Sequence, residues 1–443
     1  MGIRGEGLMM KVCVQGLWHL GSVTAAGLAS VGHDVVGLDP DQKTIDSLNQ
    51  GKAPLFEPNL DDLLQTGITK GRLRFTTTIT DAAVDAEVLW VTFDTPVDDD
   101  DRADVDFVLN QIKSILPVLS SGTVVLVSSQ MPVGSIRKLE AFACENLANK
   151  HLSFACSPEN LRLGKALDVF LNPDRIVVGV RTEEARSKLE KLLLPITDRI
   201  EWMSVESAEM TKHAINAFLA TSVTFANEIA SICELVGADA KEVERGLKTE
   251  TRIGSKAYLS PGGPFAGGTL ARDIEFLGIE SQAKQLITPL LTSVKVSNDE
   301  HKNWVRRKLL ERFPDLKGVT VAIWGLTYKP NTDTLRRSLA VELCDWLIER
   351  GASVQVHDPV VRQLPESWLG HVVSYASALD AVLEADVLVV GTEWLEFRQE
   401  AANLLSAAKP NLVIIDANRH LQTAVVSLGL GYVAVGTPLT SEG

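Results

Sequence analysis

The sequence has few features of a small secreted, membrane-spanning or nucleic-acid-binding protein. Its five cysteines among 443 residues are widely scattered and form no C-x-x-C pair, so neither a disulfide framework nor a zinc site is indicated. No uninterrupted apolar run approaches the roughly 18 residues that suggest a membrane span. The net charge of -14 argues against the basic face of a nucleic-acid-binding protein. We therefore expect a reducing, cytoplasmic setting, no nucleic-acid or membrane partner and no bound metal.

The start of the chain also lacks the apolar core of a signal peptide. We interpret the first eight residues as a short leader ahead of a strand at Lys11, with Met9 or Met10 as the alternative start. What the sequence does contain is 45 % hydrophobic and 23 % charged residues, which is typical of a globular protein. The length exceeds one ordinary core, so two or three domains are expected.

Apolar runs of strand length alternate with helix-period segments along most of the chain, which predicts βαβ units and parallel sheets. The expected strands are Lys11–Gln15, Val35–Leu38, Glu87–Thr92, Thr123–Ser128 and Arg175–Val180, then Val319–Trp324, Ser353–His357, Val387–Val390 and Leu412–Ile415. The two sets could repeat one architecture, although no clear repeat of sequence is visible.

The middle of the chain has a different pattern. Residues Glu206–Leu235 contain no glycine or proline and predict one long helix. Asp239 with Glu242 three residues later is a capping-box-like start to another helix. Thr251–Asp273, rich in glycine, predicts a functional loop. The expected fold is α/β, with two doubly wound Rossmann-like domains joined by a long central helix and a helical middle domain, over residues 9–200, 201–300 and 318–443.

The segment Gly16–Gly21 lies where the first strand should turn into a helix, the place for a dinucleotide fingerprint. A helix N-terminus there offers unpaired N–H groups to a pyrophosphate. Gly16 permits the tight turn and Gly21 permits close packing, but Trp18 replaces the middle glycine, so its side chain must point away or the cofactor must sit differently. Asp39, about 20 residues on, would accept the ribose hydroxyls of NAD; the alternative is a simple Asp-Pro turn.

Short motifs in a fixed order run through nearly the whole chain. They are Gly37-Leu38-Asp39 with Lys43, Glu57-Pro58, Thr95-Pro96 with Ala103-Asp104, Ser129–Gly134, Pro158–Gly164 with Pro173-Asp174-Arg175, Glu209 with Lys212, Asn216 and Asn227-Glu228, Arg252-Ile253-Gly254, Pro264–Asp273, Gly325–Pro330 with Asp333 and Arg336, and Thr392-Glu393-Trp394. This set resembles the UDP-glucose/GDP-mannose dehydrogenase family, whose members oxidise the sugar of a nucleotide sugar with NAD. Gln130 and Leu163 replace a family threonine and a family glutamate.

The resemblance implies an NAD-binding first domain, a central dimerisation domain, a UDP-sugar-binding last domain, a homodimer and a place in polysaccharide biosynthesis. The implied catalytic residues are Lys212, Asn216, Thr269, Asp273 and Glu159. The implied cofactor-binding residues are Gly16, Trp18, His19, Leu20, Gly21, Asp39, Lys43, Thr95, Pro96, Ser129, Gln130, Arg272 and Arg336. The implied substrate-binding residues are Glu159, Leu161, Lys212, Arg252, Tyr258, Phe265 and Lys329.

Each implied role has a chemical reason. Lys212 and Asn216, four residues apart on one helix, would stabilise the alkoxide, and Lys212 could act as a base if burial lowers its pKa. Asp273 would position a water or the base, and Glu159 would contact substrate or water. Each residue could alternatively be an ordinary surface group. The acidic segment Asp98–Asp101 is interpreted as a solvated turn rather than a metal site.

Thr269 falls where the family has its catalytic cysteine, which traps the aldehyde intermediate as a thiohemiacetal. A threonine hydroxyl is a far weaker acid than a thiol and needs a positioned base. Four outcomes stay open: one oxidation only, direct oxidation of a hydrated aldehyde, oxidation followed by reduction as in an epimerase, or a silent sugar-nucleotide binder. Cys156 is a candidate substitute thiol, with a buried structural cysteine as the alternative.

Overall fold

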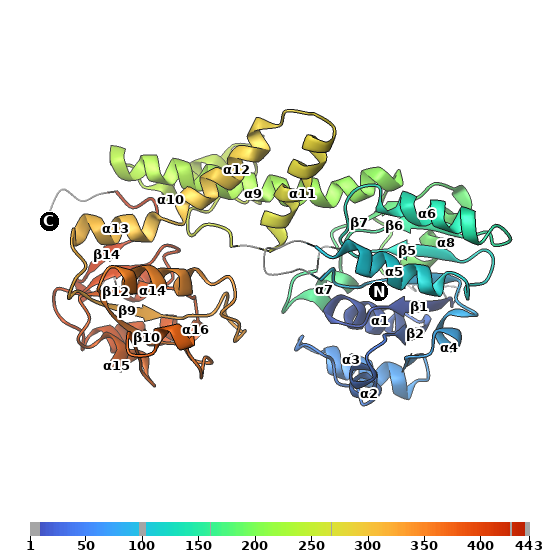
Figure 1. Cartoon of the computed structure of the whole chain (residues 1–443), viewed down its shortest axis with the longest axis horizontal. Helices are drawn as coiled ribbons and strands as arrows, with labels where there is room; N and C mark the ends of the chain where they lie inside the picture. Colours follow the sequence, from blue (N-terminus) through green and yellow to red (C-terminus); the bar gives the residue numbers. More distant parts are fainter. Residues whose placement is uncertain (1–8, 97–102, 160, 267, 426–427, 439–443) are drawn as a thin grey trace. The chain divides into compact units, whose positions relative to one another are not determined.

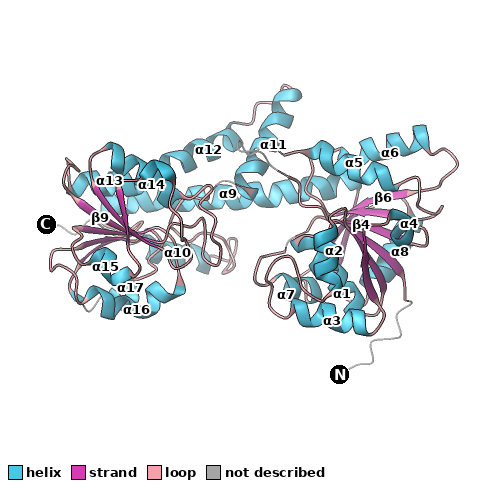
Figure 2. Ribbon diagram, turned by 60° about the horizontal axis from the view of Figure 1, so that its bottom comes forward, coloured by secondary structure: helices cyan, strands magenta, loops and turns pink. Residues whose placement is uncertain are grey.

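The computed structural model describes residues 9–96, 103–159, 161–266, 268–425 and 428–438, and it divides into two compact units, Met1–Ile215 and Asn216–Gly443. Each unit contains one sheet with helices on both faces (Figures 1 and 2). The segment Asp98–Asp101 and the residues Asn160 and Gly267, which belong to motifs discussed above, lie outside the described residues.

The first unit is built on an eight-stranded sheet in the order β3-β2-β1-β4-β5-β6-β7-β8. Neighbouring strands are parallel except β6 and β7, which pair antiparallel. The first six strands follow the order of a dinucleotide-binding fold, in which the ligand lies at the carboxyl ends of β1 and β4. The strands are β1 (Lys11–Gln15), β2 (Asp34–Leu38), β3 (Leu73–Thr76), β4 (Val88–Val91), β5 (Val124–Val127), β6 (Ser153–Cys156), β7 (Ile176–Gly179) and β8 (Ile200–Met203). The helices are α1 (His19–Ser30), α2 (Gln42–Asn49), α3 (Leu60–Thr69), α4 (Ile79–Ala83), α5 (Val105–Ile115), α6 (Ser135–Asn146), α7 (Ala166–Leu171) and α8 (Glu183–Leu193).

The second unit has a six-stranded, all-parallel sheet in the order β11-β10-β9-β12-β13-β14, preceded by helices. Its strands are β9 (Thr320–Trp324), β10 (Ser353–His357), β11 (Val372–Ser374), β12 (Val387–Val390), β13 (Val413–Ile415) and β14 (Gly431–Val433). Its helices are α10 (Ala240–Thr249), α11 (Thr269–Ala283), α12 (Pro289–His301), α13 (Trp304–Arg312), α14 (Leu339–Glu349), η1 (Glu366–Trp368), α15 (Ala378–Val382), α16 (Leu395–Leu405) and α17 (Gln422–Val425).

The central strands are apolar on both faces because helices cover both sides of each sheet. In β1, Val12 and Val14 belong to one buried cluster and Cys13 to another. In β9, Val321 and Ala322 are divided between two clusters in the same way. This two-sided burial explains why the strands are visible in the sequence as continuous apolar runs.

The first turn of each sheet has the same construction. Gly16 turns with φ +91°, and the next N–H, that of Leu17, donates to Asp39 Oδ2 at 2.8 Å. In the second sheet, Gly325 turns with φ +87°, and the following N–H donates to Asp358 Oδ2 at 2.7 Å. The two halves therefore repeat one local geometry, although their sequences show no clear repeat.

The helix α9 (Val205–Val236) has 32 residues and continues from one unit into the other. By length and composition it could cross a membrane, and 44 % of its apolar window is buried. The core helix of a globular protein meets the same criterion. Polar and small residues interrupt its apolar positions, which is why the sequence shows no continuous apolar run.

The structure confirms the expected fold class and the long central helix, and it adds five short strands that the sequence did not indicate: β3, β6, β8, β11 and β14. The predicted end of the loop Thr251–Asp273 was wrong, because α11 already begins at Thr269. There Ile274 packs against α9 and α12, and this burial favours the helix. Asp239 caps α10 through the N–H of Lys241 at 2.7 Å, whereas the Glu242 side chain pairs with Arg245, so only half of a capping box forms.

Candidate functional site

The dinucleotide turn has the geometry that a pyrophosphate requires. A Cβ on Gly21 would lie 1.8 Å from the carbonyl oxygen of Gly16, so glycine is needed for this close packing. Trp18 stands just before the first residue of α1 and is 50 % exposed, so its indole does not fill the turn. The open N–H groups of α1 and the acidic end of β2 fit NAD.

Asp39 takes part in the turn itself. Its Oδ2 accepts from the Leu17 N–H at 2.8 Å and its Oδ1 accepts from the Asp41 N–H at 2.9 Å. Each carboxylate oxygen keeps a second lone pair, so the ribose hydroxyls of a cofactor can still be accepted. Asp39 therefore satisfies both interpretations of the sequence, as a turn residue and as a ribose acceptor.

The other candidate cofactor residues of the first unit surround the carboxyl ends of β4 and β5. Thr95 Oγ1 donates to the Gln130 carbonyl at 2.6 Å, and the Pro96 carbonyl accepts from the Asp104 N–H at 2.8 Å. Ser129 is buried against a pocket of about 20 Å³, room for one water-sized molecule. Lys43 is exposed in the first turn of α2, Leu20 is buried in α1, and His19 is partly buried.

Lys212 and Glu159 come together at the same pocket. Lys212 Nζ donates to the Glu159 carbonyl at 2.7 Å and lies 3.5 Å from its carboxylate Oε1. The lysine side chain is only 12 % exposed, which is not how an ordinary surface residue behaves. Glu159 Oε2 also accepts from the Leu161 N–H at 2.6 Å, so the backbone of the predicted substrate loop is fixed to the same carboxylate.

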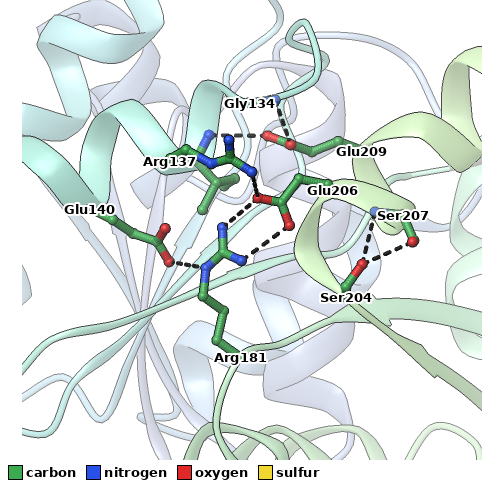
Figure 3. A network of polar contacts seen from close by, with 9 residues as sticks. Gly134, Arg137, Glu140, Arg181, Ser204, Glu206, Ser207 and Glu209 are labelled. Carbon is green, nitrogen blue, oxygen red and sulfur yellow. Dashed lines mark hydrogen bonds and ion pairs between the residues drawn. The ribbon is translucent and has the colours of Figure 1, made fainter.

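Glu209, which belongs to the motif of the long helix but was not predicted as a site residue, lies three residues before Lys212. Its carboxylate accepts from the N–H groups of Gly134 at 2.7 Å and Ile136 at 3.0 Å, at the start of α6 (Figure 3). Burial raises the pKa of Glu209 although both backbone bonds act to lower it. No local pattern marks such a residue, because its partners are more than 70 residues away.

In the second unit, the first helical residues of α11 form another cluster. The Asn216 side-chain amide donates to the carboxylate of Asp273, and both residues are buried. Thr269 is the first residue of α11, and a Cβ on the preceding Gly268 would lie 3.5 Å from Arg337 Nη1 and 3.8 Å from the Tyr328 hydroxyl. The structure thus places Thr269, Asp273 and Asn216 together, with Arg272 on the same helical turn and Arg336 exposed beside Arg337.

The remaining predicted substrate residues of the second unit lie on loops. Phe265 is fixed by Asn298, whose side chain accepts from its N–H at 2.9 Å and donates to its carbonyl at 2.8 Å. Lys329 is exposed in the first loop after β9. Arg252 and Tyr258 are exposed, and Arg252 pairs with the neighbouring Glu250 at 3.0 Å.

A pocket of about 210 Å³ opens at the carboxyl ends of β9 and β12. Its lining includes Tyr328, Arg337, Lys302 and Arg306, with Glu342 as the acidic member. Basic side chains at a strand-order reversal suit a phosphate-bearing ligand. The described residues contain no cluster of histidine, cysteine and carboxylate groups that could hold a metal.

Comparison with known proteins agrees with these two sites. The family models for the UDP-glucose/GDP-mannose dehydrogenases match three consecutive segments: the NAD binding domain over residues 10–197, the central domain over residues 206–300 and the UDP binding domain over residues 322–423. The chain belongs to the UDP-glucose/GDP-mannose dehydrogenase family. The first sheet therefore belongs to an NAD-binding domain, and the 210 Å³ pocket is lined partly by the domain that the family model describes as UDP-binding and partly by residues 263–306 before it.

Individual members of the family match over nearly the full length. The UDP-glucose 6-dehydrogenase of Pseudomonas aeruginosa is 32 % identical over 97 % of this chain and 98 % of its own. A solved UDP-glucose dehydrogenase of Pyrobaculum islandicum is 27 % identical, with a TM-score of 0.84, and covers 99 % of this chain and 100 % of its own. A UDP-D-ManNAc dehydrogenase of Pyrococcus horikoshii is 25 % identical, with a TM-score of 0.82, and covers 97 % of this chain and 99 % of its own. Similar proteins thus carry names with two different sugars.

Three of the buried cysteines, Cys13, Cys156 and Cys344, are poor nucleophiles by position. Cys156 lines the 20 Å³ pocket with Glu159 and Lys212, but burial raises its pKa, and Glu209 raises it further. Burial also raises the pKa of Cys13 to about 12 and raises that of Cys344. Because a thiolate is the reactive form, Cys156 is a structural cysteine and not a substitute for a catalytic one.

Proposed function

We propose that this protein uses NAD to oxidise the sugar of a nucleotide sugar, with a UDP-sugar as substrate, in the manner of a UDP-glucose 6-dehydrogenase. The observation that carries the proposal is the buried Lys212, held by Glu159 at the carboxyl end of an NAD-binding sheet. A cation in a water-poor site stabilises the oxygen charge that develops as an alcohol loses its proton and hydride. The matched UDP-binding domain and its basic pocket support the choice of nucleotide.

We propose the following roles for the protein groups. Two NAD molecules, bound one after the other, would accept the two hydrides. Lys212 and Asn216 stabilise the substrate oxygen, Asp273 orients Asn216 and a water, and Glu159 fixes the loop that contacts the sugar. Phe265, Lys329 and Arg252 hold the nucleotide, with the cations on phosphate. These roles divide the chain into functional segments over residues 9–200, 201–300 and 318–443.

We further propose that Thr269 occupies the position of the family's catalytic cysteine and that the second oxidation proceeds without a thioester. The first step converts the alcohol to an aldehyde, with loss of one hydride and one proton. Water then adds to the aldehyde to form a geminal diol. Loss of a second hydride and proton from the diol leaves the carboxylic acid, so Thr269 needs only to hydrogen-bond to the diol. The buried, poorly acidic thiols near the first sheet support this route.

The decisive experiment is NADH formation by the purified protein with UDP-glucose, UDP-N-acetylmannosamine and a GDP-sugar, read as NADH per sugar at completion. We expect two NADH per UDP-sugar and a carboxylate product by mass spectrometry. One NADH per sugar would show a reaction that stops at the carbonyl and would overturn the proposed second oxidation through the diol. Ligand binding without NADH would indicate an epimerase-like reaction or, with the sugar recovered unchanged, a silent binder.

The assembly and cellular role are part of the same proposal. Exposed Phe218, Phe225 and Ile232 lie seven residues apart along α9, on one face of the helix, and support a homodimer built on it. Uronic acids made from nucleotide sugars are polymer precursors, so we place the protein in polysaccharide biosynthesis. The scattered, free cysteines are consistent with the cytoplasm.

A further inference from the structure

Glu57 is a buried carboxylate that the roles above do not use. The residue is 4 % exposed and follows the 84 % exposed Phe56 in the loop between α2 and α3. Its Oε1 accepts from the Ala166 N–H at 2.7 Å, and its Oε2 accepts from the Gly164 N–H at 2.8 Å. The ring Nε2 of His19 lies 3.0 Å from the same Oε2. Three donors on one carboxylate are the condition under which such a charge can be buried.

The three donors come from two separate parts of the first unit, the dinucleotide turn and the loop that follows β6. His19 is the first residue of α1 and directly follows the dinucleotide turn. Gly164 and Ala166 end the loop that begins with Glu159 and Leu161. In sequence, Glu57 is 38 residues from His19 and 109 residues from Ala166. The carboxylate therefore connects the N-terminus of α1 to the end of the loop by direct bonds.

Both ends of this loop are held by contacts with the first sheet or with α1, which covers it. At its start, Ser157 Oγ donates to the Val177 carbonyl at 2.9 Å. After its end, α7 packs on α1, where a Cβ on Gly27 would lie 2.4 Å from the ring of Phe170, and that ring is 6.2 Å from the Trp90 ring. Between these fixed ends, Leu161 and the contact that its N–H makes with Glu159 depend on the path of residues 161–165. Glu57 sets that path at the side of the nucleotide turn.

We propose that Glu57 is a positioning residue that couples the two ligand sites of the first unit, so that a dinucleotide bound at α1 orders residues 161–166. This inference rests on the proposed function, because it takes that loop as the sugar contact. A ligand at the start of α1 restricts the movement of the His19 side chain, and His19 in turn restricts the movement of the Glu57 carboxylate. That carboxylate accepts hydrogen bonds from the N–H groups of Gly164 and Ala166. Coupling of this kind is reciprocal, so the nucleotide sugar raises the affinity for the dinucleotide by the same factor.

The test compares wild type with Glu57→Gln, which keeps one acceptor oxygen but turns an amide donor toward N–H groups. Titration calorimetry gives the affinity for UDP-glucose with and without saturating NADH. We expect NADH to strengthen UDP-glucose binding about fivefold or more in the wild type and hardly at all in Glu57→Gln. Glu87→Gln is the matched control, because Glu87 accepts the Lys11 N–H at 3.0 Å at the opposite, amino end of the sheet. Equal coupling in Glu57→Gln and the control would overturn the proposal.

Hydrogen exchange at the Gly164 and Ala166 amides separates this inference from the proposed function. NADH should slow their exchange in the wild type even if UDP-glucose does not bind, and that result would keep the coupling while rejecting the proposed substrate. His19→Phe leaves the hydrogen bonds from the Gly164 and Ala166 N–H groups to Glu57 in place. In this variant, the two amides should exchange slowly without ligand, and bound NADH should not slow their exchange further. If bound NADH leaves the exchange rates of these two amides unchanged in the wild type, the coupling is overturned. If the protein does not bind NADH, both proposals are overturned.

Discussion

Asp273 is the residue on which the second cluster depends, because it is fully buried and accepts from the Asn216 amide. Asp273→Asn keeps an acceptor oxygen in the same place but removes the negative charge. We expect kcat to fall about 100-fold or more, as for loss of a general-base or water-orienting carboxylate, with only a small change in the urea midpoint. Asp273→Ala should also lose about 1–3 kcal/mol of stability, since Asn216 is then left without this acceptor. A wild-type kcat in Asp273→Asn would remove Asp273 from the mechanism.

Thr269 allows a second comparison at the scale of one residue. If its hydroxyl only hydrogen-bonds to the diol, Thr269→Ala should lower kcat by about tenfold, the cost of one weak bond, and leave the NADH stoichiometry unchanged. Thr269→Cys places a thiol at the N-terminus of the 15-residue helix α11, where its pKa is lowered. Intact-mass spectrometry during turnover should then detect a sugar adduct that the wild type lacks. Complete loss of turnover in Thr269→Ala would instead make the hydroxyl an essential reactant.

Glu209 predicts a pH dependence of stability. Burial raises its pKa in the folded state above the 4.5 of the unfolded chain, so the folded protein retains this proton to a higher pH. The stabilising contribution is therefore complete below pH 4.5 and declines as the pH rises through the raised pKa. Glu209→Gln imitates the protonated form, so its stability relative to wild type should improve with rising pH in urea titrations. A difference that is independent of pH would contradict this assignment.

At the scale of elements, an ion-pair network joins the first turn of α9 to α6 and to the end of β7 (Figure 3). Arg181 contacts Glu206 at 2.8 Å and Glu140 at 2.6 Å, and Arg137 contacts Glu206 at 2.6 Å. The hydrogen bonds from Arg181 and Arg137 lower the pKa of Glu206 to about 2. This stabilisation is present above pH 4.5 and is lost as the pH falls toward 2. Arg181→Gln should lower the free energy of unfolding by roughly 1 kcal/mol at neutral pH, as measured by urea unfolding. The variant should also lose less stability than the wild type between pH 4.5 and 2. The same loss of stability in both proteins over this pH range would contradict the prediction.

The sequence predicts an element well when burial dominates that element. Strands such as β1 and β10 have the predicted bounds. Helices cover both faces of these strands, so each strand is visible in the sequence as a continuous apolar run. The short strand β3 was missed, since its four residues LRFT alternate buried and exposed and carry a charge. The start of α11 depends on packing against α9 and α12, which no local pattern contains.

The same distinction holds for the site. Lys212 and Asn216 were predicted from their place in the long-helix motif, and their spacing of four residues predicts only that they share one helix face. Glu57 and Glu209 could not be predicted as supporting groups, because their donors lie 38 to 109 residues away for Glu57 and 73 to 75 away for Glu209. Buried carboxylates that hold backbone N–H groups become recognisable only when the chain is folded.

At the scale of the whole molecule, the proposed homodimer leads to a prediction about catalysis. Arg252 is exposed and forms an ion pair with its neighbour Glu250, which suits a side chain that reaches a second copy. Phe218→Glu with Phe225→Glu should yield monomers in light scattering with unchanged circular dichroism. Leu369→Glu, at an exposed apolar residue that follows η1 in the second unit, should leave the proposed dimer intact.

If Arg252 serves the partner's substrate, two inactive variants should restore each other. Arg252→Ala and Asp273→Asn dimers, unfolded and refolded together in equal amounts, form half heterodimers, and each heterodimer has one complete site. Activity should then recover to about a quarter of the wild-type value, because the two-fold symmetry gives one intact site in every four. Either variant refolded alone should stay inactive. If a mixture contains heterodimers but regains no activity, Arg252 acts within its own chain. In that case the exposed apolar face of α9 has no part in bringing Arg252 to the active site.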